Sequence, residues 1–212
     1  SMVVRQARAE ATRQSLIVAA VELFGEVGYG DTDMIDVIER AKATKGTCYY
    51  YFPSKRSLAA AIIEQANAGI AAAMAPIWES EAPPMHRLIM ATFRFVAVTE
   101  SDPIVRVGYQ LRQAMNQISE AGAKSYANTE SVFASALKGA AADGHVRPEV
   151  NPKEAAYTLF TALVGCRLLC DAFDESPFVR LTQVWRTFLR SVAPEDVIDE
   201  LTRVVRAEAK RR

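Results

Sequence analysis

Hydrophobic residues recur along almost the whole chain at spacings of three and four, which is the period of an amphipathic helix. No stretch shows the period-two alternation, with β-branched residues and Asn-Gly or Asp-Gly turns, that indicates strands and hairpins. We therefore predict an all-α protein. Half of the 212 residues are hydrophobic, which is enough to bury a substantial core.

The first quarter of the chain predicts a long helix, two short helices and a second long helix. Gly28 follows the first apolar stripe as a stop signal, Thr32 or Asp33 can cap the first short helix, and Ser54 can cap the second long helix. We expect the long helices over about 8–27 and 55–78, the first short helix to end near 41, and the second to span 44–52.

The rest of the chain repeats one helix-start signal, a small polar residue followed by proline. It occurs at Asp102-Pro103, Asn151-Pro152 and Ser176-Pro177, and it marks a helix start because the polar side chain caps free N–H groups while proline needs no partner there. The expected helices lie near 84–101, 103–118, 124–143, 152–172, 177–192 and 194–209.

Composition narrows the class of protein. The longest apolar stretches are interrupted by charge before the roughly 18–20 residues that a membrane span needs, and no signal sequence is evident. Cys48, Cys166 and Cys170 are odd in number and lack the paired spacings of zinc or redox motifs. We expect a cytoplasmic protein with no disulfide framework, no cofactor, no metal and no membrane partner.

Charge is balanced overall but not along the chain. There are 25 basic and 25 acidic side chains, yet the segment 40–56 holds five basic residues and no acidic one. They are Arg40, Lys42, Lys45, Lys55 and Arg56. Such a local positive field on a neutral body suits a nucleic-acid partner, although a solvated surface gives the same pattern.

The two short helices, separated only by Lys42-Ala43 and flanked by long helices, have the proportions of a helix-turn-helix. The second helix would enter the major groove of DNA, with Lys45 donating to a guanine edge or a phosphate and Gly46 allowing a close backbone approach. Phe52 is expected in the small core beneath this helix, and Tyr50 partly so.

Two stretches carry a specific resemblance, which covers about residues 8–63. Leu16-Ile17-x-x-Ala20-x-x-Leu23-Phe24-x-x-x-Gly28-Tyr29-x-x-Thr32 resembles the first helix of the tetracycline-repressor (TetR) family, and the run from Thr44 to Lys55 resembles its recognition helix and exit. The resemblance implies a DNA-binding domain over 1–54 and a ligand-binding and dimerisation domain over 55–212. It implies base or phosphate contacts from Thr44, Lys45, Gly46, Thr47, Tyr49, Tyr51 and Lys55, and it places Thr32 or Asp33 at the backbone-facing start of the preceding helix. Lys42, in the turn, adds a further cation that can contact a phosphate.

Two residues depart from that family pattern. Lys42 stands where the family usually has glycine, so any left-handed backbone conformation there carries a steric cost. Cys48 stands where the family prefers leucine.

The remainder of the chain resembles the γ-butyrolactone receptor branch of the same family. The blocks that carry this resemblance are residues 88–93, 102–111, 163–168 and 185–194. It implies a homodimer whose small hydrophobic effector releases it from a palindromic operator in double-stranded DNA. Thr129 replaces a tryptophan that such receptors place in the pocket.

The expected effector pocket and two-fold interface come from this second part. The pocket set is Met74, Trp78, Met90, Phe93, Val107, Leu111, Met115, Thr129 and Phe133. The interface set is Leu159, Leu163, Cys166, Leu181, Val184 and Phe188. Methionine and aromatic stripes at helical spacing also occur in ordinary cores, so plain packing is the alternative for each.

Two other classes of function remain open on the sequence. A small all-α enzyme is disfavoured because His86 and His145, the only histidines, lie in separate regions with no Cys or Ser motif nearby. A helical adaptor that binds a ligand or protein, with a degenerate DNA-binding head, is favoured only by Lys42 and Cys48. Steep salt dependence of DNA affinity would exclude the adaptor.

Overall fold

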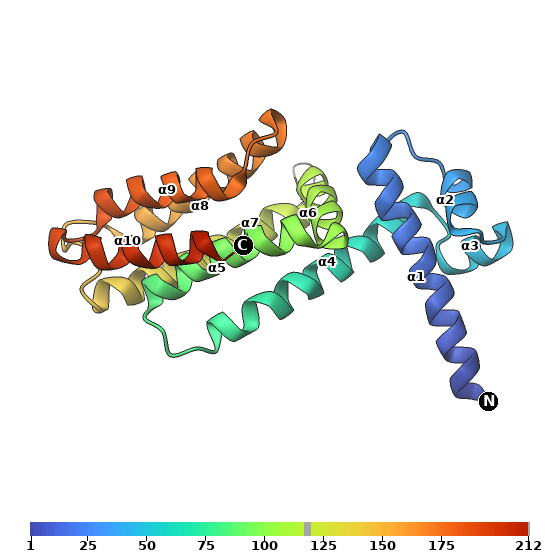
Figure 1. Cartoon of the computed structure of the whole chain (residues 1–212), viewed down its shortest axis with the longest axis horizontal. Coiled ribbons are helices and arrows are strands. Elements are labelled where there is room, and N and C mark those ends of the chain that lie inside the picture. Colours follow the sequence, from blue (N-terminus) through green and yellow to red (C-terminus); the bar gives the residue numbers. More distant parts are fainter. Residues whose placement is uncertain (117–119, 212) are drawn as a thin grey trace. The chain divides into compact units, whose positions relative to one another are not determined.

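The computed structural model describes residues 1–116 and 120–211, and within these residues it forms ten helices and no strand (Figure 1). This confirms the predicted all-α class. The helices are α1 Met2–Val27, α2 Met34–Ala41, α3 Lys45–Tyr51, α4 Lys55–Trp78, α5 Pro84–Ser101, α6 Pro103–Asn116, α7 Glu120–Ala142, α8 Pro152–Phe173, α9 Pro177–Val192 and α10 Glu195–Lys210.

Most helix ends lie where the capping signals predict them. The Asp102 carboxylate accepts from the Ile104 N–H at 3.0 Å, and the Asn151 side chain accepts from the Lys153 N–H at 2.9 Å. The Ser54 hydroxyl accepts from the Ser57 N–H at 3.0 Å. These bonds satisfy donors that the first turn of a helix leaves without an internal partner.

Two helix starts differ from the predictions. α1 begins at Met2 instead of about residue 8, and α7 begins at Glu120 instead of 124. The first turns of α1 are exposed and show no apolar stripe, so hydrophobic periodicity could not reveal them. The end expected near 118 lies outside the described residues.

The chain forms two compact units, and the first contains the predicted helix-turn-helix. It comprises Ser1–Ala71 and Val98–Ile118, so it extends beyond the DNA-binding segment expected over 1–54. The reason is that α6 packs on α1, which adds two α6 side chains to a core built from α1 to α4. This core includes Leu16, Ile17, Phe24, Val37, Cys48, Phe52, Leu58, Ile62, Val107 and Leu111.

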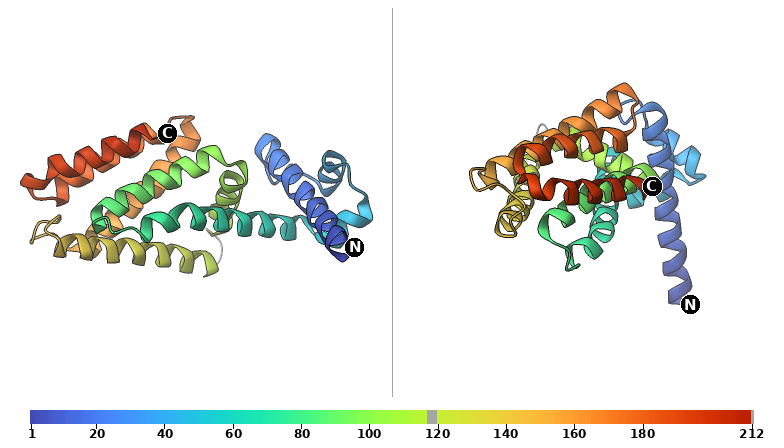
Figure 2. Two further views of the ribbon diagram at one scale, coloured as in Figure 1. Left: turned by 60° about the horizontal axis from the view of Figure 1, so that its bottom comes forward. Right: turned by 60° about the vertical axis from the view of Figure 1, so that its left-hand side comes forward.

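The second unit comprises Ala72–Ala97 and Ser119–Arg212. Within it α8 packs against α7 and α9, and α9 packs against α10, as the two views of Figure 2 show. Its core includes Met85, Leu88, Phe93, Leu137, Leu159, Leu181, Trp185 and Leu189. The buried Trp185 indole N–H donates to the Thr92 hydroxyl at 2.8 Å, so the one polar atom of this large side chain is satisfied.

Two helices, α4 and α8, are long and apolar enough to cross a membrane by length and composition alone. Each holds an 18-residue window of mean hydropathy 1.4 with no more than two charged residues. The expectation that charge interrupts every apolar stretch before it reaches the length of a membrane span is therefore wrong for these two helices, despite Glu64 in α4 and Arg167 in α8. Two such helices are weak evidence for a membrane, because core helices of soluble proteins meet the same criteria.

Candidate nucleic-acid interface

The turn between α2 and α3 has the left-handed geometry that the missing glycine made doubtful. Lys42 adopts φ 54° and ψ 37°, and the Ala43 N–H donates to the Ile38 carbonyl at 3.1 Å. α2 and α3 contact each other and α1, and this packing holds Lys42 in a conformation that L-residues usually avoid (Figure 1). The helix-turn-helix is therefore formed despite the substitution.

The α3 helix has a buried side and an exposed side. Cys48 and Phe52, four residues apart, are fully buried in the core of the first unit, which confirms the expectation for Phe52. Lys45, Gly46 and Tyr49 are exposed on the other side. The hydroxyl of Thr44 caps the helix by accepting from the Thr47 N–H at 3.1 Å.

Tyr50 is the surface residue that sequence reasoning missed. Its side chain is 80% exposed, so the expectation that it lies partly in the core is wrong. It follows Gly46 by four residues and so shares that residue's exposed face, a signal that was available in the sequence. Tyr51 is the half-buried tyrosine of this run, and it packs against the core and meets the Tyr50 ring edge-on at 5.0 Å.

Cys48 takes the place of a core leucine. No part of its side chain is exposed, and burial raises the pKa of its thiol because a thiolate loses its hydration there. The thiol therefore stays neutral and packs as a small apolar group.

Two of the five basic residues in 40–56 are committed to the fold. Arg40 on α2 donates to Glu26 at 2.9 Å and to Glu22 at 3.1 Å on α1, and this hydrogen bonding lowers the pKa of the Glu26 carboxyl. The Lys55 ammonium donates to the Tyr29 carbonyl at 2.7 Å and lies 4.4 Å from the centre of the Tyr29 ring. Both contacts tie α1 and the segment after it to the helices that follow.

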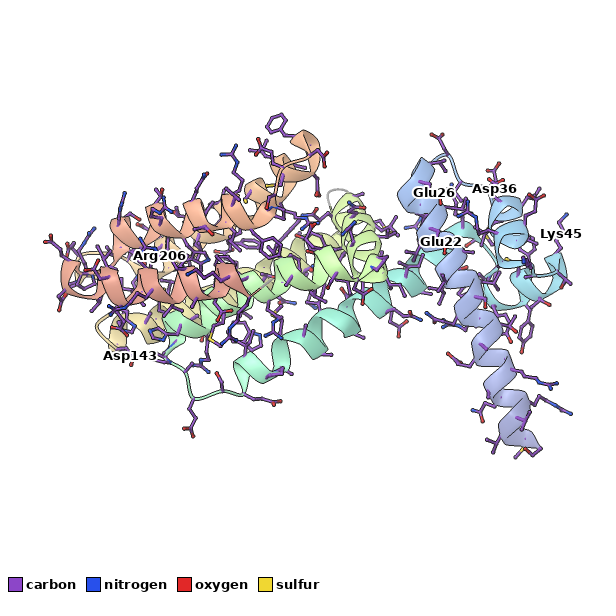
Figure 3. The ribbon with its side chains drawn as sticks, in the orientation of Figure 1. Glu22, Glu26, Asp36, Lys45, Asp143 and Arg206 are labelled. Carbon is purple, nitrogen blue, oxygen red and sulfur yellow. The ribbon has the colours of Figure 1, made fainter. Side chains whose placement is uncertain are left out.

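The other three basic residues are exposed, and within the described part of the chain none pairs with a carboxylate. They are Lys42, Lys45 and Arg56. Lys45 projects outward from α3, whereas Glu22 and Glu26 lie on α1 (Figure 3). Among the described residues, carboxylates thus offset the charge of Arg40 alone within 40–56, because the hydrogen-bond partner of Lys55 is a neutral carbonyl.

The two residues expected at the start of α2 have different surroundings. Thr32 is fully buried, and its hydroxyl donates to the Gly28 carbonyl at 2.8 Å, so it closes the turn after α1. Asp33 is exposed, and its N–H donates to the Asp36 carboxylate at 3.1 Å. The side chain of Thr32 therefore offers no surface to DNA in this structure.

The residues expected to line an effector pocket divide between the two units. Val107, Leu111 and Met115 belong to the first unit, where Val107 and Leu111 are part of the core beneath the helix-turn-helix. The other six belong to the second unit. Of these, Met74 and Phe93 are buried, Met90 and Phe133 are half-buried, and Trp78 and Thr129 are exposed.

Phe133 belongs to an aromatic group between α7 and α8. Its ring meets Phe160 edge-on with 5.6 Å between centroids, and Tyr126 lies 6.1 Å from the same Phe160 ring. Thr129, between Tyr126 and Phe133 in sequence, points its hydroxyl to the Ser125 carbonyl at 3.2 Å. Its polar group is thus used locally.

The expected interface residues are placed differently along α8 and α9. Leu159, Leu181 and Phe188 are buried within the core of a single chain, and Leu163, Cys166 and Val184 are half-buried. Sequence periodicity missed the exposed apolar side chains of the same two helices. They are Tyr157, Leu168, Leu169, Phe173 and Val179, each at least 49% exposed.

Comparison with known proteins agrees with this arrangement. Residues 16–62 match the bacterial regulatory proteins of the tetR family, and residues 83–194 match the tetracyclin repressor-like C-terminal domain. The A-factor receptor protein of Streptomyces griseus is 26% identical over 196 residues, which are 92% of this chain and 68% of that protein.

Two solved structures share the fold over nearly the whole chain. A gamma-butyrolactone receptor (ArpA-like protein) has a TM-score of 0.81 and 23% identity, covering 97% of this chain and 100% of that one. CprB of Streptomyces coelicolor, solved in complex with its biological operator sequence, has a TM-score of 0.79 and 24% identity over the same shares. The chain belongs to the TetR family, as a DNA-binding transcriptional regulator related to the γ-butyrolactone receptors.

Proposed function

We propose that this chain is a homodimeric repressor that holds a palindromic operator through α3 and leaves it when a small hydrophobic ligand, of the kind that γ-butyrolactones represent, binds its second unit. The observation that carries this proposal is the two-sided α3 helix. It buries Cys48 and Phe52 while presenting Lys45, Gly46, Tyr49 and Tyr50 to solvent.

Gly46 supports a role in close contact with another molecule. A Cβ built at this position meets no atom within 4 Å, so packing inside the chain does not require glycine here. Glycine at this position instead suits contact with DNA, because a residue without a side chain lets the base edges in the major groove approach the helix backbone.

The polar groups around Gly46 suit DNA chemistry. Lys45 can donate to guanine O6 or N7 or to a phosphate, and Thr44 and Thr47 can donate to a phosphate or touch a thymine methyl. Tyr49 and the newly recognised Tyr50 can hold phosphates through their hydroxyls. Lys42 adds an exposed cation at the turn.

Lys55 positions the start of α4 in addition to its proposed phosphate contact. An ammonium has three donors, so the bond to the Tyr29 carbonyl leaves capacity for a phosphate. Thr32 acts from within, by closing the turn that sets the start of α2, and Asp33 is the exposed residue at that start.

The exposed apolar side chains of α8 and α9 support dimerisation through these helices. Apolar groups such as Leu168, Leu169 and Phe173 gain most when a second copy removes them from water. A two-fold dimer presents two copies of α3, which matches a palindrome. The same burial accounts for the apolar composition of α8 in a cytoplasmic protein.

The ligand step follows from linkage. The ligand would bind more tightly to a conformation of the dimer that cannot bind DNA, and it would therefore lower the affinity for DNA. DNA lowers the affinity for the ligand by the same factor. The half-buried aromatic group Tyr126, Phe133 and Phe160 is the part of the second unit that best suits a small hydrophobic molecule.

Selection of bound duplexes from a random library, followed by affinity measurement over a range of salt concentrations, tests the DNA-binding step. We expect Lys45→Ala to weaken operator binding by about 1–3 kcal/mol per half-site if the contact is to a base. Lys138→Ala, which removes an exposed cation from α7, is the matched control and should leave affinity unchanged. A protein that prefers no duplex over random competitor, or whose affinity ignores Lys45→Ala, would contradict the proposal.

A further inference from the structure

The only two histidines of the chain lie together in the second unit, beside a glutamate. His86 is on α5, His145 is in the connection between α7 and α8, and Glu200 is on α10. One ligand atom from each lies within 4.8 Å of the other two, and His86 Nε2 is 3.2 Å from Glu200 Oε1. The two imidazole rings are parallel to within 3°, with centroids 5.7 Å apart.

Two ring nitrogens of this cluster are buried and without a hydrogen bond to any described residue. They are His86 Nε2, whose approach to Glu200 is close but not of hydrogen-bond geometry, and His145 Nδ1. The His145 residue is only 8% exposed. Buried polar atoms are nearly always satisfied, so a pair of orphaned nitrogens facing a carboxylate calls for an explanation.

The backbone fixes where these side chains stand. Gly144 adopts φ +79°, and this turn allows the His145 N–H to donate to the Ala140 carbonyl at 2.9 Å. Two residues later the Arg147 N–H donates to the Val192 carbonyl at 2.8 Å, just before α10 begins. The three side chains therefore converge from elements whose ends are held by hydrogen bonds.

We propose that His86, His145 and Glu200 form a binding site for Zn²⁺ or a similar first-row transition-metal dication. Two imidazole nitrogens and one carboxylate are a ligand set that zinc accepts, whereas Mg²⁺ and Ca²⁺ prefer oxygen alone. Bonds of about 2.0–2.1 Å in a tetrahedron put ligand atoms roughly 3.3 Å apart. The His86–Glu200 distance of 3.2 Å already matches this spacing, and the remaining ligand atoms, all within 4.8 Å of one another, would move closer on binding the ion.

The exposure of the cluster leaves room for a fourth ligand. The Glu200 side chain is 48% exposed, so a water molecule can complete the coordination from the solvent side. The ion would cross-link α5, the α7–α8 connection and α10, and it would stabilise the second unit because it binds the folded chain. This inference does not depend on the proposed DNA or ligand chemistry.

Titration of the metal-free full-length protein with Zn²⁺, and with Co²⁺ as a visible probe, tests the site. We expect a rise in Tm with Zn²⁺ and the absorption of four-coordinate Co²⁺, with shifts of both histidine ring signals in NMR spectra. Glu200→Gln and His145→Gln should each weaken Zn²⁺ binding by about 10–100-fold or more. Removing a residue that only hydrogen-bonds to a metal ligand already costs that much, and these two variants remove the ligands themselves.

Two controls separate this site from other binding. Asp199→Asn changes the exposed neighbour of Glu200 on the same helix, and the double variant Cys166→Ser and Cys170→Ser removes the other pair of zinc-seeking side chains. Both should retain full affinity. Absence of Zn²⁺ binding, binding lost in the cysteine variant, or binding unaffected by Glu200→Gln would each overturn the proposal. Since Glu200 is exposed, its substitution tests the site even if His145→Gln fails to fold.

Discussion

Replacing Lys42 by glycine should stabilise the protein while weakening its hold on DNA. Lys42 is one of two non-glycine residues with positive φ among those described, and it occupies the turn of the helix-turn-helix. Glycine adopts φ 54° without the clash between Cβ and the neighbouring carbonyl oxygen, and the same change removes an exposed cation next to α3.

The expected gain in stability is the difference between two effects. Relief of the left-handed conformation contributes about 1–2 kcal/mol. The larger backbone entropy of glycine in the unfolded chain opposes it by about 0.5–1 kcal/mol. A net gain of roughly 0.5–1 kcal/mol corresponds to a rise in Tm of about 1–4 °C for a chain of this length.

The expected loss in DNA binding is read from the salt dependence. Each phosphate contact contributes about −0.9 to the slope of log K against log salt concentration. Loss of one contact from each of two copies should therefore reduce the slope by about 1.8 in magnitude. Thermal unfolding and fluorescence anisotropy with labelled operator, each on the same preparation, measure the two effects.

Lys42→Ala is the matched variant. It removes the same charge but keeps a Cβ in the left-handed conformation, so its DNA binding should resemble that of Lys42→Gly while its Tm should stay near that of the parent. Equal Tm values for the glycine and alanine variants would refute the argument from backbone strain. An unchanged salt slope in both would remove Lys42 from the DNA interface.

Two further predictions concern the first unit. Gly108→Ala on α6 should destabilise by about 1–3 kcal/mol in urea unfolding, because its Cβ would lie 2.3 Å from the Ala66 Cβ and 2.9 Å from the Ile62 carbonyl oxygen. Gly25→Ala on α1, where a Cβ meets nothing within 4 Å, should instead stabilise by up to about 1 kcal/mol, and similar effects for the two would contradict the packing described. Arg40 lowers the pKa of Glu26, so this pair adds stability above the usual glutamate pKa and loses it as pH falls through the lowered value. Arg40→Gln should therefore flatten the acid limb of the stability–pH curve, and an unchanged limb would show that the pair contributes nothing.

The sequence by itself determined the helical class, most helix boundaries and the motif at α2 and α3. These features depend on neighbouring residues: a polar cap before proline, apolar side chains at helical spacing, and a glycine stop. The pairs at Asp102-Pro103 and Asn151-Pro152 act on the first turn of their own helices, so no distant contact was needed to locate α6 and α8.

Only the tertiary structure decided how individual side chains are used. The run of aromatic residues suggested that Tyr50 is partly buried, while its spacing from Gly46 indicated the surface, and the packing of α3 on α1 and α2 decides between them by leaving Tyr50 exposed and burying Cys48. The sequence also counted Arg40 and Lys55 in one basic segment, without partners for either. Their partners, Glu26 and the Tyr29 carbonyl, belong to other elements of the fold, so these contacts could not be identified from neighbouring residues in the sequence.

The same limit applies to residues far apart in sequence. The sequence predicted that Val107 lies in the effector pocket of the ligand-binding domain, yet α6 places it in the core beneath the helix-turn-helix. His86 and His145 lie in separate regions of the sequence, yet in the folded chain the centroids of their rings are 5.7 Å apart. Local signals determine backbone conformation because their interactions act within one turn of helix. The partner of a side chain depends instead on which helices pack together, and that packing is determined by the apolar surface buried over the whole unit.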